Sequence, residues 1–196
     1  MNILDAVKRL RGKTSAGMMD CKAALKEAGG DIDKAVDVLR KKGIAKAAKK
    51  SERTASQGIV ESYIHMGSRI GVLLEVNCET DFVARNSDFK KVCKELAMQV
   101  AAANPMYVSR DEVPAESIEK EREIFKSQIK DKPAEVVEKI VDGKLNKYYS
   151  EVCLLEQPFI KDPNIRIKDM VTQLIATLGE NMVVKRFARF EVGEQD

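Results

Sequence analysis

Hydrophobic residues in the first part of the chain recur at helical spacing in three runs. The third run is the clearest, because its apolar positions follow the i, i+3, i+4, i+7 rule and begin directly after a capping residue, Asp31. Gly12, Gly29–Gly30 and Gly43 are placed to end the three helices. The pattern predicts a three-helix module over residues 1–43, with these inward positions: Ile3, Leu4, Val7, Leu10, Met18, Cys21, Leu25, Ala28, Ile32, Ala35, Val36 and Leu39.

Two adjacent methionines, Met18 and Met19, follow a predicted cap at Thr14 or Ser15. Neighbouring residues on a helix point about 100° apart, so one methionine can fill the small core while the other faces solvent. An exposed, flexible methionine suits the binding of a partner. The alternative is that both are partly buried at the start of the helix, and the pattern leaves both interpretations open.

Residues 44–57 read IAKAAKKSERTASQ and contain almost no large apolar side chain. The Ala-Lys part can extend the third helix, whereas the Ser-Thr-Gln part has the composition of a flexible linker. Its basic residues can contact RNA or acidic lipid, or simply face water, and we favour a solvated hinge. The basic residues are Lys46, Lys49, Lys50 and Arg53.

Alternation with a period of two replaces the helical pattern after residue 57. Residues 58–66 and 70–78 have the pattern of two strands joined by a short glycine-containing loop, which predicts a hairpin. Helical patterns and a final alternating strand follow. This order predicts an α+β domain over residues 58–196, with an antiparallel or mixed sheet of about three strands packed with helices. The later elements begin near Ser87 or Asp88, after Pro114, after Pro133, at Ile167 and at Met182.

Charge and composition exclude several classes of function. The 196 residues include 34 Lys and Arg against 31 Asp and Glu, a net charge of +3 that argues against a dedicated nucleic-acid binder. The four cysteines form no CxxC pair and the only histidine is His65, so no zinc site is expected. No phosphate loop or nucleophile-base pattern appears either. We therefore expect neither an enzyme nor a cofactor.

The chain also lacks the patterns that direct a protein to a membrane. Its N-terminal residues contain no apolar secretory core, and no run approaches the roughly 20 apolar residues that span a bilayer. We expect a cytoplasmic protein with reduced thiols.

The connection between the second strand and the next helix carries an unusual apolar pair. Phe82 and Val83 directly follow Thr80 and Asp81, at a place where a connection lies on the surface. In one interpretation Thr80 or Asp81 caps the next helix and Phe82 folds back as a hydrophobic staple. In the other, Phe82 projects into a partner protein and Asp81 competes there for polar or charged groups. From this segment alone we favour the first interpretation.

Four parts of the chain resemble the elongation factor Ts family. They are residues 7–11 with Thr14 and residues 17–22 (GMMDCK), residues 30–32, residues 74–86, and residues 154–162 with 189–194. Together they span nearly the whole chain. The resemblance implies a small N-terminal module similar to a ubiquitin-associated domain, a linker and a core domain. It also implies guanine-nucleotide exchange on elongation factor Tu during translation.

The resemblance further implies roles for individual residues. Thr80, Asp81, Phe82 and Val83 are expected to enter the GTPase domain of elongation factor Tu near the nucleotide, where the phenylalanine wedges between helices, Mg²⁺ is displaced and GDP is released. A second contact is expected from the N-terminal module, against another helix of the GTPase. The residues implied there are Arg11, Met18 and Met19.

The chain departs from the family's pattern in two ways. The usual Thr-Gly-Ala-Gly turn carries a serine, Ser15, in place of its first glycine, a change that a turn can absorb. Many members also have a second core module and a coiled-coil insertion, whereas this chain resembles the short type, in which two chains supply what one long chain supplies elsewhere. Together with the open edges of a three-stranded sheet, this predicts a homodimer.

The main alternative to the exchange function is a binding module without exchange activity.

Overall fold

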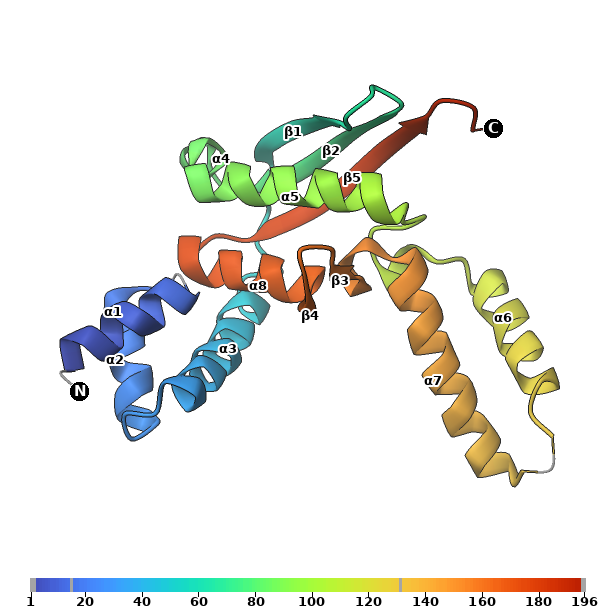
Figure 1. Cartoon of the computed structure of the whole chain (residues 1–196), viewed down its shortest axis with the longest axis horizontal. Coiled ribbons are helices and arrows are strands. Elements are labelled where there is room, and N and C mark those ends of the chain that lie inside the picture. The colour runs from blue at the N-terminus through green and yellow to red at the C-terminus, as the bar shows by residue number, and fades with distance from the viewer. Residues whose placement is uncertain (1–2, 15, 131, 195–196) are drawn as a thin grey trace. The chain divides into compact units, whose positions relative to one another are not determined.

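The computed structural model describes residues 3–14, 16–130 and 132–194, which form two compact units (Figure 1). The first unit takes the described residues of three segments, Met1–Ile59, Val76–Lys90 and Asp169–Val183. The second takes those of Val60–Glu75, Lys91–Lys168 and Val184–Asp196. Both units are therefore built from segments far apart in the sequence. The division into residues 1–43, 44–57 and 58–196 stays a prediction.

Three helices begin the first unit, as the hydrophobic pattern predicted: α1 (Ile3–Thr14), α2 (Met18–Glu27) and α3 (Ile32–Ala48). The side chain of Asp31 caps α3 by accepting hydrogen bonds from the backbone N–H groups of Asp33 and Lys34, at 2.9 and 3.0 Å. The core between the helices is small because much of it is alanine. Its buried residues are Ala6, Val7, Leu10, Cys21, Ala24, Leu25 and Ala35.

Both predicted boundaries between α1 and α2 are wrong. Helix α1 passes through Gly12 to Thr14, whose hydroxyl donates to the Leu10 carbonyl at 2.8 Å instead of capping α2. Gly17 precedes α2 without a capping side chain, and Ser15, the other predicted cap, lies outside the described residues. A single glycine costs a helix only about 1 kcal/mol, which the surrounding helix formers offset.

Helix α3 likewise continues through Gly43, the third predicted end. A Cβ atom on Gly43 would lie 3.5 Å from the Cβ of Ala176, so this glycine lies in close contact with α8 (Ile167–Leu178). The Ala-Lys sequence that follows favours helix and carries α3 on to Ala48. Part of the predicted linker is therefore helical.

Strands β1 (Gln57–Ile64), β2 (Ile70–Cys78) and β5 (Met182–Glu191) form the predicted three-stranded antiparallel sheet, in the order β1-β2-β5. Alternate residues of β2 are buried on one face, namely Val72, Leu74, Val76 and Cys78. Helix α5 (Ser87–Ala103) runs across a face of this sheet (Figure 1). The α+β prediction is confirmed.

The remaining helices of the second unit are α6 (Ala115–Ser127) and α7 (Ala134–Val152), with 3-10 turns at Arg110–Glu112 and Leu154–Glu156. Pro114 and Pro133 immediately precede the two helices, as predicted. Helices α6 and α7 pack as a helical hairpin, in which Arg122 forms ion pairs with Glu138 and Asp142. A second, two-stranded sheet of β3 (Pro158–Phe159) and β4 (Asp162–Arg166) was not predicted, because so short a strand has no measurable period.

Replacing Gly58 by alanine is expected to lower the free energy of unfolding by about 2 kcal/mol or more. The φ angle of Gly58 is +148°, and an added Cβ would lie 2.2 Å from the carbonyl oxygen of Val76, so the backbone of β2 would have to shift. Chemical denaturation followed by circular dichroism measures the difference. Gly143→Ala is the control, because that glycine lies within α7 with no atom within 4 Å of an added Cβ. Equal stability of Gly58→Ala and wild type would contradict the prediction.

Candidate functional site

The connection after β2 folds into a short helix, α4 (Asp81–Arg85). Thr80 precedes it in an extended conformation, and its hydroxyl accepts a hydrogen bond from the Val83 N–H at 3.4 Å. On the inner side of this turn Ala84 is buried. Of the two predicted caps, Thr80 and Asp81, the structure has Thr80.

Phe82 points away from this turn and is 82% exposed. The predicted hydrophobic staple is therefore wrong, because a staple would have buried the ring against the following helix. Asp81 accepts a hydrogen bond from the Arg85 guanidinium at 2.6 Å, one turn later on the same helix. The turn thus presents a large aromatic side chain to solvent beside a paired carboxylate.

The far end of this turn is held by Asn86. Its side-chain oxygen accepts hydrogen bonds from the backbone N–H groups of Asp88 and Phe89, at 2.8 and 3.4 Å, and so caps α5. The predicted caps, Ser87 and Asp88, are wrong by one or two positions. Phe89 is fully buried at the start of α5. The exposed Phe82 therefore lies between two capped helix starts.

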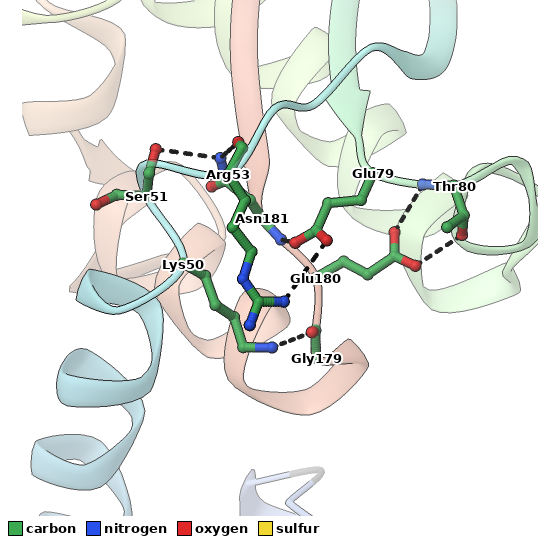
Figure 2. A network of polar contacts seen from close by, with 8 residues as sticks. All are labelled: Lys50, Ser51, Arg53, Glu79, Thr80, Gly179, Glu180 and Asn181. Carbon is green, nitrogen blue, oxygen red and sulfur yellow. Dashed lines mark hydrogen bonds and ion pairs between the residues drawn. The ribbon is translucent and has the colours of Figure 1, made fainter.

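Glu180, in the turn between α8 and β5, holds Thr80 in place (Figure 2). The sequence did not single out this residue. Its two carboxylate oxygens accept hydrogen bonds from the hydroxyl and the backbone N–H of Thr80, at 2.6 and 3.0 Å. No local motif marks Glu180, because its partner lies 100 positions earlier in the chain.

In the N-terminal module Met18 is 53% exposed and Met19 is 74% exposed, and Arg11 is also exposed. Neither interpretation of the methionine pair holds, because the inward positions of α2 are filled by Cys21, Ala24 and Leu25. These three exposed residues lie in the same compact unit as the turn that carries Phe82. Exposed methionines side by side are typical of surfaces that bind other proteins.

Three of the four basic residues after Gly43 have partners within the chain. Lys46 forms an ion pair with Asp20 at 2.9 Å, Arg53 lies 3.6 Å from a carboxylate oxygen of Glu79, and Lys50 donates to the carbonyl of Gly179. Cations engaged in this way are less free to bind phosphates. The segment therefore lends little support to RNA binding.

All four cysteines are buried, and none of them forms a disulfide bond. The thiol of Cys78 donates to the carbonyl oxygen of Thr80 at 3.1 Å, and burial raises its pKa, with a further increase from the nearby carboxylate of Glu180. Burial, with a smaller contribution from Glu156, raises the pKa of Cys153 to about 11. These thiols stay protonated near neutral pH.

The site is therefore an exposed aromatic side chain on a capped turn, with two exposed methionines in the same unit. Exposed apolar side chains held by ordered backbone are typical of binding sites for other proteins. Among the described residues no cluster of three or more His, Cys, Asp or Glu could hold a metal ion. Within the same residues no helix is long and apolar enough to cross a membrane. The exposed ring on its capped turn is therefore the candidate site for binding another protein.

Comparison with known proteins identifies the family. A family model described as "Elongation factor TS" matches residues 22–194. Elongation factor Ts of Thermodesulfovibrio yellowstonii is 59% identical over 189 residues, which cover 96% of this chain and 94% of that protein. Elongation factors Ts of Carboxydothermus hydrogenoformans and Caldanaerobacter subterraneus are each 60% identical over 96% of this chain. The aligned residues cover 88% of the first protein and 96% of the second. The chain belongs to the elongation factor Ts family.

At pH 8 we expect a thiol reagent such as DTNB to label none of the four cysteines of the folded protein at an appreciable rate. Burial hinders access, and the raised pKa values of Cys78 and Cys153 keep their thiols neutral. In denaturant all four should react, because unfolding exposes every thiol to the reagent and an exposed cysteine has a pKa of about 8.5. Ser127→Cys, at an exposed position of α6, is the positive control. Rapid labelling of a native cysteine would show that it is accessible.

Proposed function

We propose that this chain accelerates GDP release from elongation factor Tu by inserting Phe82 beside the nucleotide site, with displacement of Mg²⁺. Membership of the elongation factor Ts family implies nucleotide exchange on elongation factor Tu in translation. The observation that carries the finer proposal is the 82% exposure of Phe82 on a turn capped by Thr80. A factor that works in this way forms no covalent intermediate and needs no cofactor of its own.

Exchange follows from differential affinity. If the factor binds nucleotide-free elongation factor Tu more tightly than the GDP form, it must weaken GDP binding by the same ratio. Each tenfold ratio corresponds to about 1.4 kcal/mol. Burial of one phenylalanine contributes about 2 kcal/mol, so Phe82 alone supplies roughly thirtyfold. Loss of Mg²⁺ would add repulsion between the phosphates of GDP, because the ion is a large local charge.

Each residue of the turn has a part in this proposal. Thr80 fixes the first residue of α4, Phe82 enters the partner, and Val83 is the half-buried residue whose N–H closes the cap. Asp81 is paired with Arg85 in the free chain, and a carboxylate that exchanges this partner can reshape the surroundings of the Mg²⁺ ion. The turn therefore presents an apolar and an acidic group together.

The N-terminal module supplies a second contact in this proposal, through Arg11, Met18 and Met19. Flexible, polarizable methionines adapt to an apolar surface, and both are exposed in the free chain. A second contact on the same compact unit raises affinity without acting at the nucleotide. We therefore assign affinity mainly to the module and the rate of release mainly to Phe82.

Replacing Phe82 by alanine should slow the maximal rate of GDP release at saturating factor by about thirtyfold, while the factor still binds elongation factor Tu. Stopped-flow release of fluorescent GDP gives the rate, and its dependence on factor concentration gives the affinity. Met106→Ala removes another exposed apolar side chain, outside the proposed site, and should behave as wild type. An unchanged rate for Phe82→Ala would refute the role of Phe82, and binding of the wild-type chain without any acceleration would favour a binding module.

We also propose that the chain forms a homodimer through the sheet face that carries exposed apolar residues. On β2, Leu73 points opposite to the buried Val72 and Leu74. Outer strands β1 and β5 add further exposed apolar residues, and Arg186 of β5 forms an ion pair with Glu75 of β2 at 2.7 Å. A second copy would cover such a face with one identical to it. The exposed apolar residues are Val60, Ile64, Leu73 and Phe190.

Light scattering at micromolar concentration should give a mass near twice the 21.9 kDa of one chain. Leu73→Glu should lower it toward one chain, because two copies would then bury like charges against each other. Ile124→Glu, an exposed position on the helical hairpin, should leave the mass unchanged. A wild-type mass near that of a single chain would overturn the dimer.

A cytoplasmic location, without direct nucleic-acid or membrane partners, also stays a prediction.

A further inference from the structure

We propose that Glu180 is a positioning residue for Phe82, acting through Thr80 from the turn between α8 and β5. The proposal rests on the proposed function, because positioning matters only if Phe82 enters the partner. Glu180 does not itself need to touch elongation factor Tu. It completes the helix cap that holds the Phe82 turn (Figure 2).

The geometry resembles a capping box whose two halves come from distant parts of the chain. In the local form, a Glu or Gln at the third helical position returns a hydrogen bond to the N–H of the capping residue. That position in α4 is Val83, which has no side-chain acceptor. Glu180 accepts from the Thr80 N–H at 3.0 Å instead, and so takes the place of the missing acidic residue.

The second carboxylate oxygen of Glu180 orients the cap. It accepts from the Thr80 hydroxyl at 2.6 Å, and the proton of that hydroxyl is therefore committed to Glu180. The oxygen lone pairs are left to accept from the Val83 N–H at 3.4 Å. Hydrogen bonds to a charged acceptor are roughly twice as strong as neutral ones and polarise the bonds that follow them. Without Glu180, the hydroxyl can rotate and the cap loses its fixed direction.

A helix as short as α4 depends on such a cap. It has five residues, whereas isolated helices below about 12 residues are marginal because nucleation is costly. Phe82 is its second residue and is 82% exposed, so the ring gains little from packing within its own chain. The conformation that presents Phe82 is therefore set mainly at Thr80, through its contacts with Val83 and Glu180.

The turn that carries Glu180 is itself fixed by buried contacts. Asn181 is 3% exposed, and its N–H donates to the Glu79 carboxylate at 2.6 Å. Its side-chain amide donates to the carbonyls of Arg53 and Ser51, at 2.7 and 3.3 Å. A buried amide is costly to leave unsatisfied, so these bonds select one path for the backbone. Figure 2 shows the segment after α3 and the start of the Phe82 turn meeting at this point.

The test is Glu180→Gln, which keeps the size of the side chain but cannot accept both hydrogen bonds from Thr80. Its amide group would face a donor, so the cap should loosen. We expect the maximal rate of fluorescent-GDP release to fall by about fivefold, with less than about a twofold change in the half-saturating factor concentration. Thr80→Ala removes the hydroxyl and should act similarly. Glu138→Gln, a carboxylate paired with Arg122 and Lys126 in the helical hairpin, is the matched control.

A double variant separates positioning from general destabilisation. If Glu180 acts by placing Phe82, then Glu180→Gln in a Phe82→Ala background should cause no further slowing, because no ring remains to be placed. The same fivefold loss in both backgrounds would overturn the proposal. So would a wild-type rate for Glu180→Gln in a series where Phe82→Ala is slow.

Amide hydrogen exchange tests the same contact without elongation factor Tu. The N–H groups of Thr80 and Val83 should exchange faster in Glu180→Gln than in wild type, while the amides of α7 stay unchanged. Unchanged amide exchange at both positions would overturn the proposal, whatever the GDP-release assays show. A wild-type chain that does not accelerate GDP release would instead refute the proposed function, and the exchange result would still decide the role of Glu180.

Discussion

The exposed turn depends on one pair of hydrogen bonds, those that Thr80 donates to Glu180. An apolar ring held in water gains nothing from its own chain, so the conformation that exposes it must be stabilised elsewhere. Here the stabilising groups are polar and lie behind the ring, at the start of α4. Asn181 and Glu79 extend this support, because their contacts fix the turn that carries Glu180.

The same polar contacts explain why the first unit combines three distant segments. The segment after α3, the Phe82 turn and the end of α8 share hydrogen bonds and ion pairs among Lys50, Arg53, Glu79 and residues 179–181. Gly179 adopts a φ of +81° directly after α8, a conformation that suits glycine at a helix end. The proposed second contact, on the N-terminal module, thus belongs to the compact unit that also holds Phe82.

Much of the fold could be predicted from local patterns. The alternation of β2, the starts of α6 and α7 after prolines and the Asp31 cap are each encoded within a few residues, and all are present. Glycine alone was a poor guide to helix ends, since α1 and α3 pass through Gly12 and Gly43. A glycine within a helix is tolerated when the neighbours favour helix or when another helix packs closely against it.

For the site, the sequence by itself indicated the motif and a cap at Thr80 or Asp81, because a cap and the N–H that it accepts from lie only a few positions apart. The structure shows that Thr80 is the cap. The four parts of the chain that resemble the elongation factor Ts family also indicated the family from the sequence alone. Only the tertiary structure decided that Phe82 faces solvent instead of packing as a staple, that Met18 and Met19 are both exposed, and that Glu180 completes the cap. Contacts between residues a hundred positions apart have no period and no local motif, so they become visible only when the segments are brought together in space.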